Sequence, residues 1–187
     1  AEIHALASQG KRVLGIATQD GAEGQTIPRE EESGHLSGLT WQGLIAFHDP
    51  LRPTVKAAIQ HIAAAGVRTV IVTGDHRGTA TAIAQSLGLI DGHGVVVTGD
   101  ELAELPPEVL RERIPDIAVF ARVTPEQKML ITEIHQSRGE VVAVTGDGVN
   151  DAPALRAADI GVAVGSGTDV AKGAADLVIL ADNFETI

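Results

Sequence analysis

The stretch TGDGVNDAPAL, residues 145–155, carries the strongest structural and chemical signal in this chain. It follows residues 141–144, a Val-Val-Ala-Val run that reads as a buried strand bounded by glycine. The Gly-rich turn that follows holds two carboxylates, Asp147 and Asp151, and leads into a helix. Open α/β sheets bind their ligands at this place, beyond the carboxyl ends of the strands. The stretch therefore predicts an α/β fold with a polar site at the edge of its sheet.

Strands and helices alternate along the chain on both sides of this stretch. Apolar runs predict strands at residues 12–18, 39–47, 67–72, 95–97, 117–120, 141–144, 160–164 and 177–180. Periodic and capped segments predict helices at residues 2–8, 53–65, 77–87, 105–113, 125–137, 152–157 and 168–174. Residues 20–38 are polar and rich in Gly and Glu, which predicts a loop or linker. The alternation predicts a parallel sheet with helices on both of its faces.

Composition restricts both the core and the partners. Apolar residues make up 44% of the 187 residues but aromatic residues only 2%, so Val, Ile, Leu and Ala must form the core. Such a core suits a buried parallel sheet. The net charge of −11 argues against nucleic acid or an anionic membrane surface as a partner. The absence of cysteine excludes disulfides and thiolate metal sites, and no apolar run approaches the length of a transmembrane helix.

Asp147 and Asp151 are candidate metal ligands. Carboxylate oxygens suit a hard cation such as Mg²⁺, which proteins bind through one or two carboxylates together with substrate phosphates. The alternative is a turn in which Asp and Gly serve only backbone geometry. The length of the motif at residues 145–155 favours the metal site over turn chemistry alone.

A second polar turn, Thr73-Gly74-Asp75, follows the strand predicted at residues 67–72. The Thr73 hydroxyl and nearby backbone N–H groups could hold phosphoryl oxygens. The same hydroxyl could equally well cap the next helix. A similar tripeptide at residues 98–100 follows a shorter apolar run, and we expect it to be a turn.

Residues 121–128, ARVTPEQK, predict the start of a helix that carries an unexpected cation. Thr124 suits the N-cap, Pro125 the first helical position and Gln127 the capping box. Lys128 then lies in the first turn, where a cation is unfavourable for the helix dipole. A phosphate that faces Lys128 would explain its presence. The alternative is a solvated surface lysine.

Together with residues 49–53, these motifs resemble, in their order, the motifs of P-type cation-transporting ATPases of the type II, calcium-pump-like class. Those ATPases belong to the haloacid dehalogenase-like superfamily. Residues 49–53 are by themselves an ordinary strand-to-helix connection. They depart from the family's Asp-Pro-Pro-Arg by having Leu51 in place of the second proline. The resemblance covers nearly the whole chain and implies a Rossmann-like, haloacid dehalogenase-type three-layer fold.

The resemblance also implies a role for each of these residues. Asp147 corresponds to the family's direct Mg²⁺ ligand, and Asp151 would join the same metal shell. The implied catalytic residues are Thr73, Lys128, Asn150 and Asp151. The residues implied to line the nucleotide and hinge region are Asp49, Arg52, Gly74, Asp75 and Arg122.

The same resemblance implies a domain division and a parent protein. Residues 1–38 would be the end of a nucleotide-binding domain with a linker, and residues 39–187 the second segment of the phosphorylation domain. The family's nucleophile motif, Asp-Lys-Thr-Gly-Thr, is absent from the chain, and so is Asp-x-Asp-x-Thr. We therefore expect an inactive fragment, with ends that look cut, of an ATP-driven cation pump that forms an aspartyl-phosphate. Mg²⁺ would be the cofactor and ATP the substrate of the parent.

The expected partners are the other parts of the same polypeptide, namely its nucleotide-binding, actuator and transmembrane domains. The chain itself would be a cytoplasmic domain of an integral membrane protein. The alternative is a soluble haloacid dehalogenase-like phosphohydrolase or a non-catalytic phosphate-binding domain of that superfamily. A nucleophile motif upstream and flanking apolar segments of membrane-spanning length in the full gene would favour the pump.

Overall fold

The computed structural model describes residues 3, 6, 11–19, 38–47, 50–91 and 94–180. The helix predicted at residues 2–8 lies mostly outside this part. The strands are β1 Arg12–Thr18, β2 Thr40–Phe47, β3 Ile71–Val72, β4 Val95–Thr98, β5 Ile117–Ala121, β6 Ala143–Gly146, β7 Ile160–Val164 and β8 Leu177–Ile179. The helices are α2 Val55–Ala64, α3 Arg77–Leu87, α4 Gly99–Glu104, α5 Pro107–Arg113, α6 Pro125–Ser137, α7 Ala152–Ala157 and α8 Asp169–Ala174. Two short 3₁₀ turns, η2 Ile114–Asp116 and η3 Val149–Asp151, complete the described elements.

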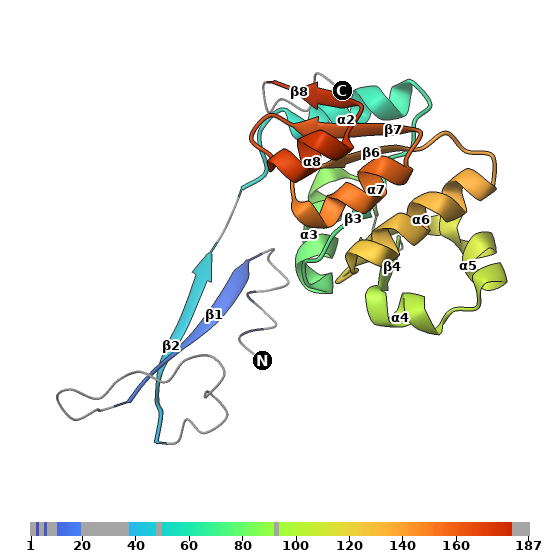
Figure 1. The fold of residues 1–187 in the computed structure, drawn as a ribbon. Coiled ribbons are helices and arrows are strands. Elements are labelled where there is room, and N and C mark those ends of the chain that lie inside the picture. The colour runs from blue at the N-terminus through green and yellow to red at the C-terminus, as the bar shows by residue number, and fades with distance from the viewer. Residues whose placement is uncertain are drawn as a thin grey trace.

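The α/β part of the chain contains two three-stranded sheets in which every described pair of strands is parallel. One sheet has the order β3-β5-β4, and the other has the order β6-β7-β8. β6 and β3 form the facing edges of the two sheets (Figure 1). The predicted alternation of parallel strands and helices is confirmed. Among the described residues, no hydrogen-bonded pairing joins β6 to β3, so the parallel strands form two sheets.

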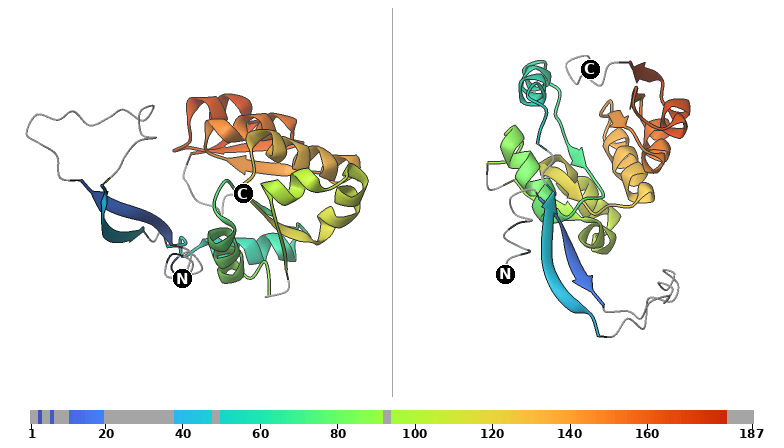
Figure 2. Two further views of the ribbon diagram at one scale, coloured as in Figure 1. Left: turned by 90° about the horizontal axis from the view of Figure 1, so that it is seen from below. Right: turned by 90° about the vertical axis from the view of Figure 1, so that its left-hand side faces the viewer.

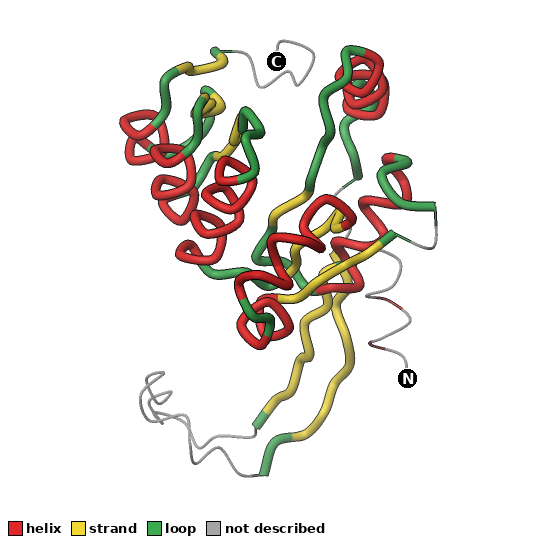
Figure 3. The backbone as a smooth tube through the Cα atoms, turned by 90° about the vertical axis from the view of Figure 1, so that its right-hand side faces the viewer, coloured by secondary structure: helices red, strands yellow, loops and turns green. Residues whose placement is uncertain are grey.

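Helices cover both faces of the first sheet (Figure 3). On one face, α4, α5 and α6 enclose a cluster around Phe120, Leu110 and Ile131. On the other face, Ala80 and Ala84 of α3 pack against the β5 strand. Small alanines let α3 approach the sheet closely, so this layer needs no aromatic residues. These layers confirm the three-layer arrangement that the alternation predicted.

The second sheet is covered on one face by α7 and α8. Leu155, Ala163 and Ala171 are fully buried there. On its other face, Leu177 of the edge strand β8 is 58% exposed, whereas its neighbour Val162 on the central strand β7 is buried. Central strands of parallel sheets are normally buried on both faces. The exposure of this face is therefore greatest at the edge strand β8.

A two-stranded antiparallel ribbon, β1 with β2, extends away from the α/β part (Figures 1 and 2). The Trp41 ring lies over Gly15, where a Cβ atom would be 2.8 Å from the ring. The ribbon exposes Leu14, Ile45 and Phe47 to solvent. Because β1 and β2 pair along their length, the ribbon spans the domain boundary predicted at residue 38.

Three local predictions differ from the structure. The strand predicted at residues 67–72 is reduced to Ile71–Val72, and the strand predicted at residues 141–144 is shifted to Ala143–Gly146. Within the described residues, both strands have a hydrogen-bonded neighbour on only one side, so apolar sequence alone does not set their length. The turn predicted at residues 98–100 was wrong, because Thr98 caps α4 with a complete capping box.

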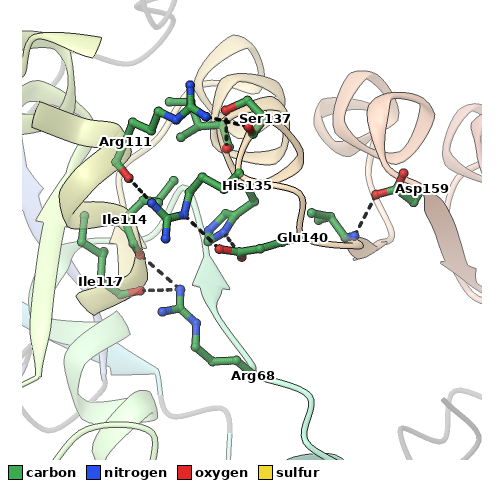
Figure 4. Close-up of polar contacts among 11 residues, drawn as sticks. Arg68, Arg111, Ile114, Ile117, His135, Ser137, Glu140 and Asp159 are labelled. Carbon is green, nitrogen blue, oxygen red and sulfur yellow. Dashed lines mark hydrogen bonds and ion pairs between the residues drawn. The ribbon is translucent and has the colours of Figure 1, made fainter. Parts of the chain in front are cut away.

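Polar contacts near the C-terminal end of α6 hold that helix in place (Figure 4). At the end of α6, Arg138 donates from Nη1 to the Arg111 carbonyl, at 2.8 Å, and from Nε to Glu140 Oε1, at 3.0 Å. His135 Nδ1 lies 2.7 Å from Glu140 Oε2. Arg68 donates to the carbonyl oxygens of Ile114 and Ile117. The Arg138 bond to Arg111 fixes the C-terminal end of α6, the helix whose first turn carries Lys128. In the described part of the chain, no helix is long and apolar enough to cross a membrane.

Candidate active site

Two polar loops meet at the carboxyl ends of β3 and β5. The Thr73 amide donates to the Phe120 carbonyl, at 2.9 Å, and the Val123 amide donates to the Thr73 carbonyl, at 3.1 Å. The Arg122 amide donates to the Asp75 carbonyl, at 3.0 Å. These bonds extend the pairing of the two strands beyond their ends. The loop at residues 73–75 therefore lies directly beside the loop that leads into α6.

Thr73 is not the cap of α3. The N-cap of that helix is His76, whose Nδ1 accepts from the Gly78 amide at 3.2 Å. Thr73 Oγ1 accepts from the Asp75 amide at 3.0 Å, within its own loop. Of the two readings that the sequence left open, the helix cap is excluded. The half-buried hydroxyl stands at the sheet edge beside two exposed residues, Gly74 and Asp75.

The start of α6 matches the prediction in every part. Thr124 is the N-cap, Pro125 takes the first position and Gln127 completes the capping box. The Lys128 side chain is only 16% exposed, and its Nζ donates to Asp151 Oδ1 at 2.6 Å. Lys128 is therefore not a solvated surface lysine. Its charge is unfavourable for the dipole of α6, and the carboxylate partner offsets this cost.

Asp151 uses both of its carboxylate oxygens for protein contacts. Oδ1 accepts from Lys128, and Oδ2 accepts from the amides of Asp147, at 3.2 Å, and Gly148, at 3.0 Å. Burial raises the pKa of Asp151, but the hydrogen bonds from Lys128 and from the two amides lower it, so that the pKa lies below its usual value. A Cβ atom on Gly146 would lie 2.5 Å from Asp151 Cβ, which explains the glycine there. Asp151 joins α6 to the turn after β6.

Asp147 differs from Asp151 in its surroundings. Its side chain is exposed, and its carboxylate makes no hydrogen bond or ion pair within the described part of the chain. Its backbone carbonyl accepts from the Thr168 amide at 2.8 Å, which fixes the turn from behind. Asn150 is also exposed, on η3. Asp147 thus offers carboxylate oxygens that are open to a ligand.

The remaining predicted site residues are less closely grouped. Asp49 lies outside the described residues. Arg52 lies in the connection between the ribbon and α2, is exposed and has a polar interaction. Arg122 stands at the meeting of the two loops, with an exposed side chain and a φ of 52°. A non-glycine residue in this left-handed region is uncommon and is held there by its surroundings.

Among the described residues, no group of three or more His, Asp or Glu side chains is arranged to hold a metal ion. A single free carboxylate can still serve Mg²⁺, since that ion retains waters and takes few protein carboxylates. Asp147 supplies one free carboxylate, whereas the oxygens of Asp151 already have partners.

The lowered pKa of Asp151 predicts a loss of stability in acid. A carboxyl group with a lowered folded-state pKa stabilises the fold fully above its unfolded pKa, which is about 3.9. That stabilisation is lost as the pH falls through the folded-state pKa. Thermal unfolding across the acidic range should show a smaller acid-dependent decrease in Tm for Asp151→Asn than for the wild-type chain. Parallel curves for the two proteins would contradict the prediction.

A family model described as haloacid dehalogenase-like hydrolase matches residues 2–159. Among similar curated proteins, the calcium-transporting ATPase of Bacillus subtilis is 47% identical over 183 residues. This match covers 97% of the chain but 20% of that ATPase. Calcium-transporting ATPase 1 of Saccharomyces cerevisiae is 45% identical over 187 residues, which cover 19% of its length. The chain thus spans about a fifth of the curated relatives that it matches.

A solved structure shows the same similarity. A zinc-transporting PIB-type ATPase in the E2.Pi state superimposes with a TM-score of 0.63 at 29% sequence identity. The superposition covers 98% of this chain and 23% of the zinc transporter. The resemblance to P-type cation-transporting ATPases that the motifs predicted is confirmed.

Proposed function

Because this chain belongs to the haloacid dehalogenase-like hydrolase family, we propose that it is the phosphorylation-domain segment of an ATP-driven cation pump. The observation that carries this proposal is the ion pair of Lys128 with Asp151, which joins α6 to the Asp147 turn. The parent would be an integral membrane protein with this segment on its cytoplasmic side. Its nucleotide-binding, actuator and transmembrane domains would lie outside the chain.

The parent reaction would proceed in two displacements at phosphorus. In the first, an aspartate oxygen would bond to the γ-phosphorus of ATP while the bond from phosphorus to the ADP oxygen breaks. In the second, a water oxygen would bond to phosphorus and release the aspartate. Negative charge gathers on the transferred oxygens in both steps, so nearby fixed cations accelerate them.

Each residue of the site has a proposed part in this chemistry. Lys128 would neutralise charge on the phosphoryl oxygens, and Thr73 would orient them through its hydroxyl and neighbouring amides. Asp147 would hold Mg²⁺, which acts as a Lewis acid when it is bound. Asp151 would act through its contacts, by keeping Lys128 beside the Asp147 turn. Asn150, Gly74, Asp75, Arg122, Arg52 and Asp49 remain proposed contacts of the phosphoryl group or nucleotide.

We propose that the nucleophile enters on a strand between β3 and β6. Each of these strands has a described partner on one side only, and they face one another in Figure 1. Thr73 follows one and Asp147 follows the other, so a parallel strand between them would end between these two residues. Val141, just before β6, is 80% exposed although it is apolar, which supports a missing neighbour. The added strand would join the two sheets into one.

The chain alone is expected to be inactive. Phosphoryl transfer needs an attacking carboxylate in line with the leaving group, and Asp151 is already bonded to Lys128 and two amides. Incubation of the purified chain with γ-labelled ATP should give neither phosphate release nor a labelled protein. A longer polypeptide that adds the nucleophile strand and the nucleotide-binding domain should become labelled in acid-stable, hydroxylamine-sensitive form. Labelling of the chain alone in that form would overturn the proposal.

Mg²⁺ should bind weakly to the isolated chain through Asp147. One free carboxylate is a minimal site for an ion that prefers additional carboxylate and phosphate oxygens. An NMR titration with Mg²⁺ should shift the signals of the Asp147 turn, and Asp147→Ala should abolish these shifts. Asp169→Ala, which removes an acidic residue from the first turn of α8, is the control and should leave the shifts unchanged. Equal shifts in the wild-type chain and Asp147→Ala would count against the assignment.

A further inference from the structure

We propose that Gln127 and Gly99 are positioning residues for Lys128. They join the first turn of α6 to the first turn of α4, and we call this junction the α4–α6 buttress. The sequence suggested no role for Gly99 beyond a turn. The inference rests on the proposed function only for what Lys128 does once it is in place.

Gln127 has contacts on both sides of its amide group. Its Oε1 accepts from the Thr124 amide at 3.0 Å, which is an ordinary capping contact within α6. Its Nε2 donates to the Gly99 carbonyl at 2.8 Å, which is a contact between two helices. The second bond is part-buried, and Gly99 itself is buried. Loss of this bond would therefore leave a buried carbonyl oxygen without this donor, which costs free energy. Gln127 therefore fixes the first turn of α6 relative to α4.

Gly99 allows the two helix ends to come this close. A Cβ atom there would lie 2.4 Å from the Arg122 carbonyl oxygen and 2.6 Å from Gln127 Oε1. The first of these atoms belongs to the backbone, which cannot move aside as a flexible side chain can. Gly99 is itself buried at the start of α4. Any larger residue must push the loop before α6 away from the sheet.

The buttress acts on the same loop that carries the left-handed Arg122. On one side, this loop is bonded to the Asp75 carbonyl through the Arg122 amide. On the other side, it packs against Gly99. A residue with a φ of 52° is held by such contacts and not by its own preference. The buttress thus determines the direction in which α6 leaves the sheet.

Lys128 follows Gln127 directly, and its side chain must cross to η3 to reach Asp151. Its own backbone amide bonds only within α6, to the Thr124 carbonyl at 3.0 Å. The bonds that anchor α6 to α5 lie at its other end, at Arg138. A small rotation of the first turn of α6 would therefore displace Nζ of Lys128. The buttress is a described contact between helices that opposes that rotation at the site.

The test is lysine-selective ¹⁵N NMR on the chain itself, which has four lysines, Lys11, Lys56, Lys128 and Lys172. The ion-paired, half-buried Lys128 ammonium should exchange its protons with water slowly. Gln127→Met keeps the size of the side chain but removes both bonds. It should speed the exchange of the Lys128 ammonium by about tenfold, the factor expected from losing a hydrogen bond. Gly99→Ala should do the same.

Matched controls separate positioning from general destabilisation. Gln136 also lies on α6, and Gln136→Met removes the bond from its Nε2 to the Ala157 carbonyl of α7. This substitution should leave Lys128 exchange unchanged. Gly173→Ala adds a methyl group where no atom lies within 4 Å, and it should also have no effect. If Gly99→Ala does not fold, Gln127→Met decides the question. Unchanged Lys128 exchange in a folded Gln127→Met chain would overturn the inference.

Catalysis supplies a separate readout. In the longer polypeptide described above, Gln127→Met should lower kcat by about tenfold without changing KM for ATP, since misplacement of a charge affects the transition state. The NMR result does not depend on any phosphoryl transfer. An altered Lys128 exchange in a polypeptide that never becomes phosphorylated would support the buttress and refute the proposed function.

Discussion

Replacing Lys128 with alanine is expected to lower the rate of phosphoryl transfer by about a hundred- to a thousandfold in a polypeptide that contains the complete domain. The Lys128 side chain is only 16% exposed, and a fixed charge in such surroundings acts more strongly than in water. Its loss would also leave the Asp151 carboxylate without its cation at the site of phosphoryl transfer. Rapid-quench measurement of phosphoenzyme formation would give the rate directly.

Two substitutions make this result specific. Lys56→Ala removes an exposed lysine on α2, away from the site, and should leave the rate unchanged. Lys128→Arg retains the charge but not the compact ammonium that reaches Asp151, and it should recover only part of the rate. Full activity in Lys128→Ala would remove the central cation from the proposed mechanism.

Replacing Asp151 with alanine is expected to lower the free energy of unfolding by about 2–4 kcal/mol. The substitution leaves the Lys128 ammonium without its carboxylate and two turn amides, those of Asp147 and Gly148, without their acceptor. Lys128 and Gly148 are partly buried, so water replaces their lost bonds incompletely. Urea unfolding of the chain at neutral pH would measure the change.

A double-mutant cycle would show how much of this loss belongs to the ion pair. Lys128→Met should cost less in the Asp151→Ala background than in the wild-type chain, because its partner is already absent. Asp159→Ala is a suitable comparison, since that carboxylate accepts one turn amide, from Val142 at 2.8 Å, and has no lysine partner in the part of the chain that the structure describes. A loss for Asp151→Ala no larger than the loss for Asp159→Ala would contradict the central role given to Asp151.

The sequence by itself determined the features that depend on neighbouring residues. The helix at residues 77–87 has its predicted bounds, and so does the helix at residues 125–137. At the second of these, Thr124, Pro125 and Gln127 supply the cap from within one turn of chain. Capping is a short-range interaction, so a few adjacent residue types are enough to specify it. The family motifs are equally local, and similar proteins confirmed the family that they indicated.

Only the tertiary structure decided which of the predicted site residues hold one another. Lys128 and Asp151 are 23 residues apart, and their contact depends on how α6 packs against the turn after β6. The same contact decided that Asp151 is occupied by protein donors whereas Asp147 is open to a ligand, although the sequence assigned both to the metal. The left-handed Arg122 and the close approach of Gly99 were also hidden from the sequence, because separate loops impose them. Packing between distant segments selects such contacts, and no local pattern of residues encodes it.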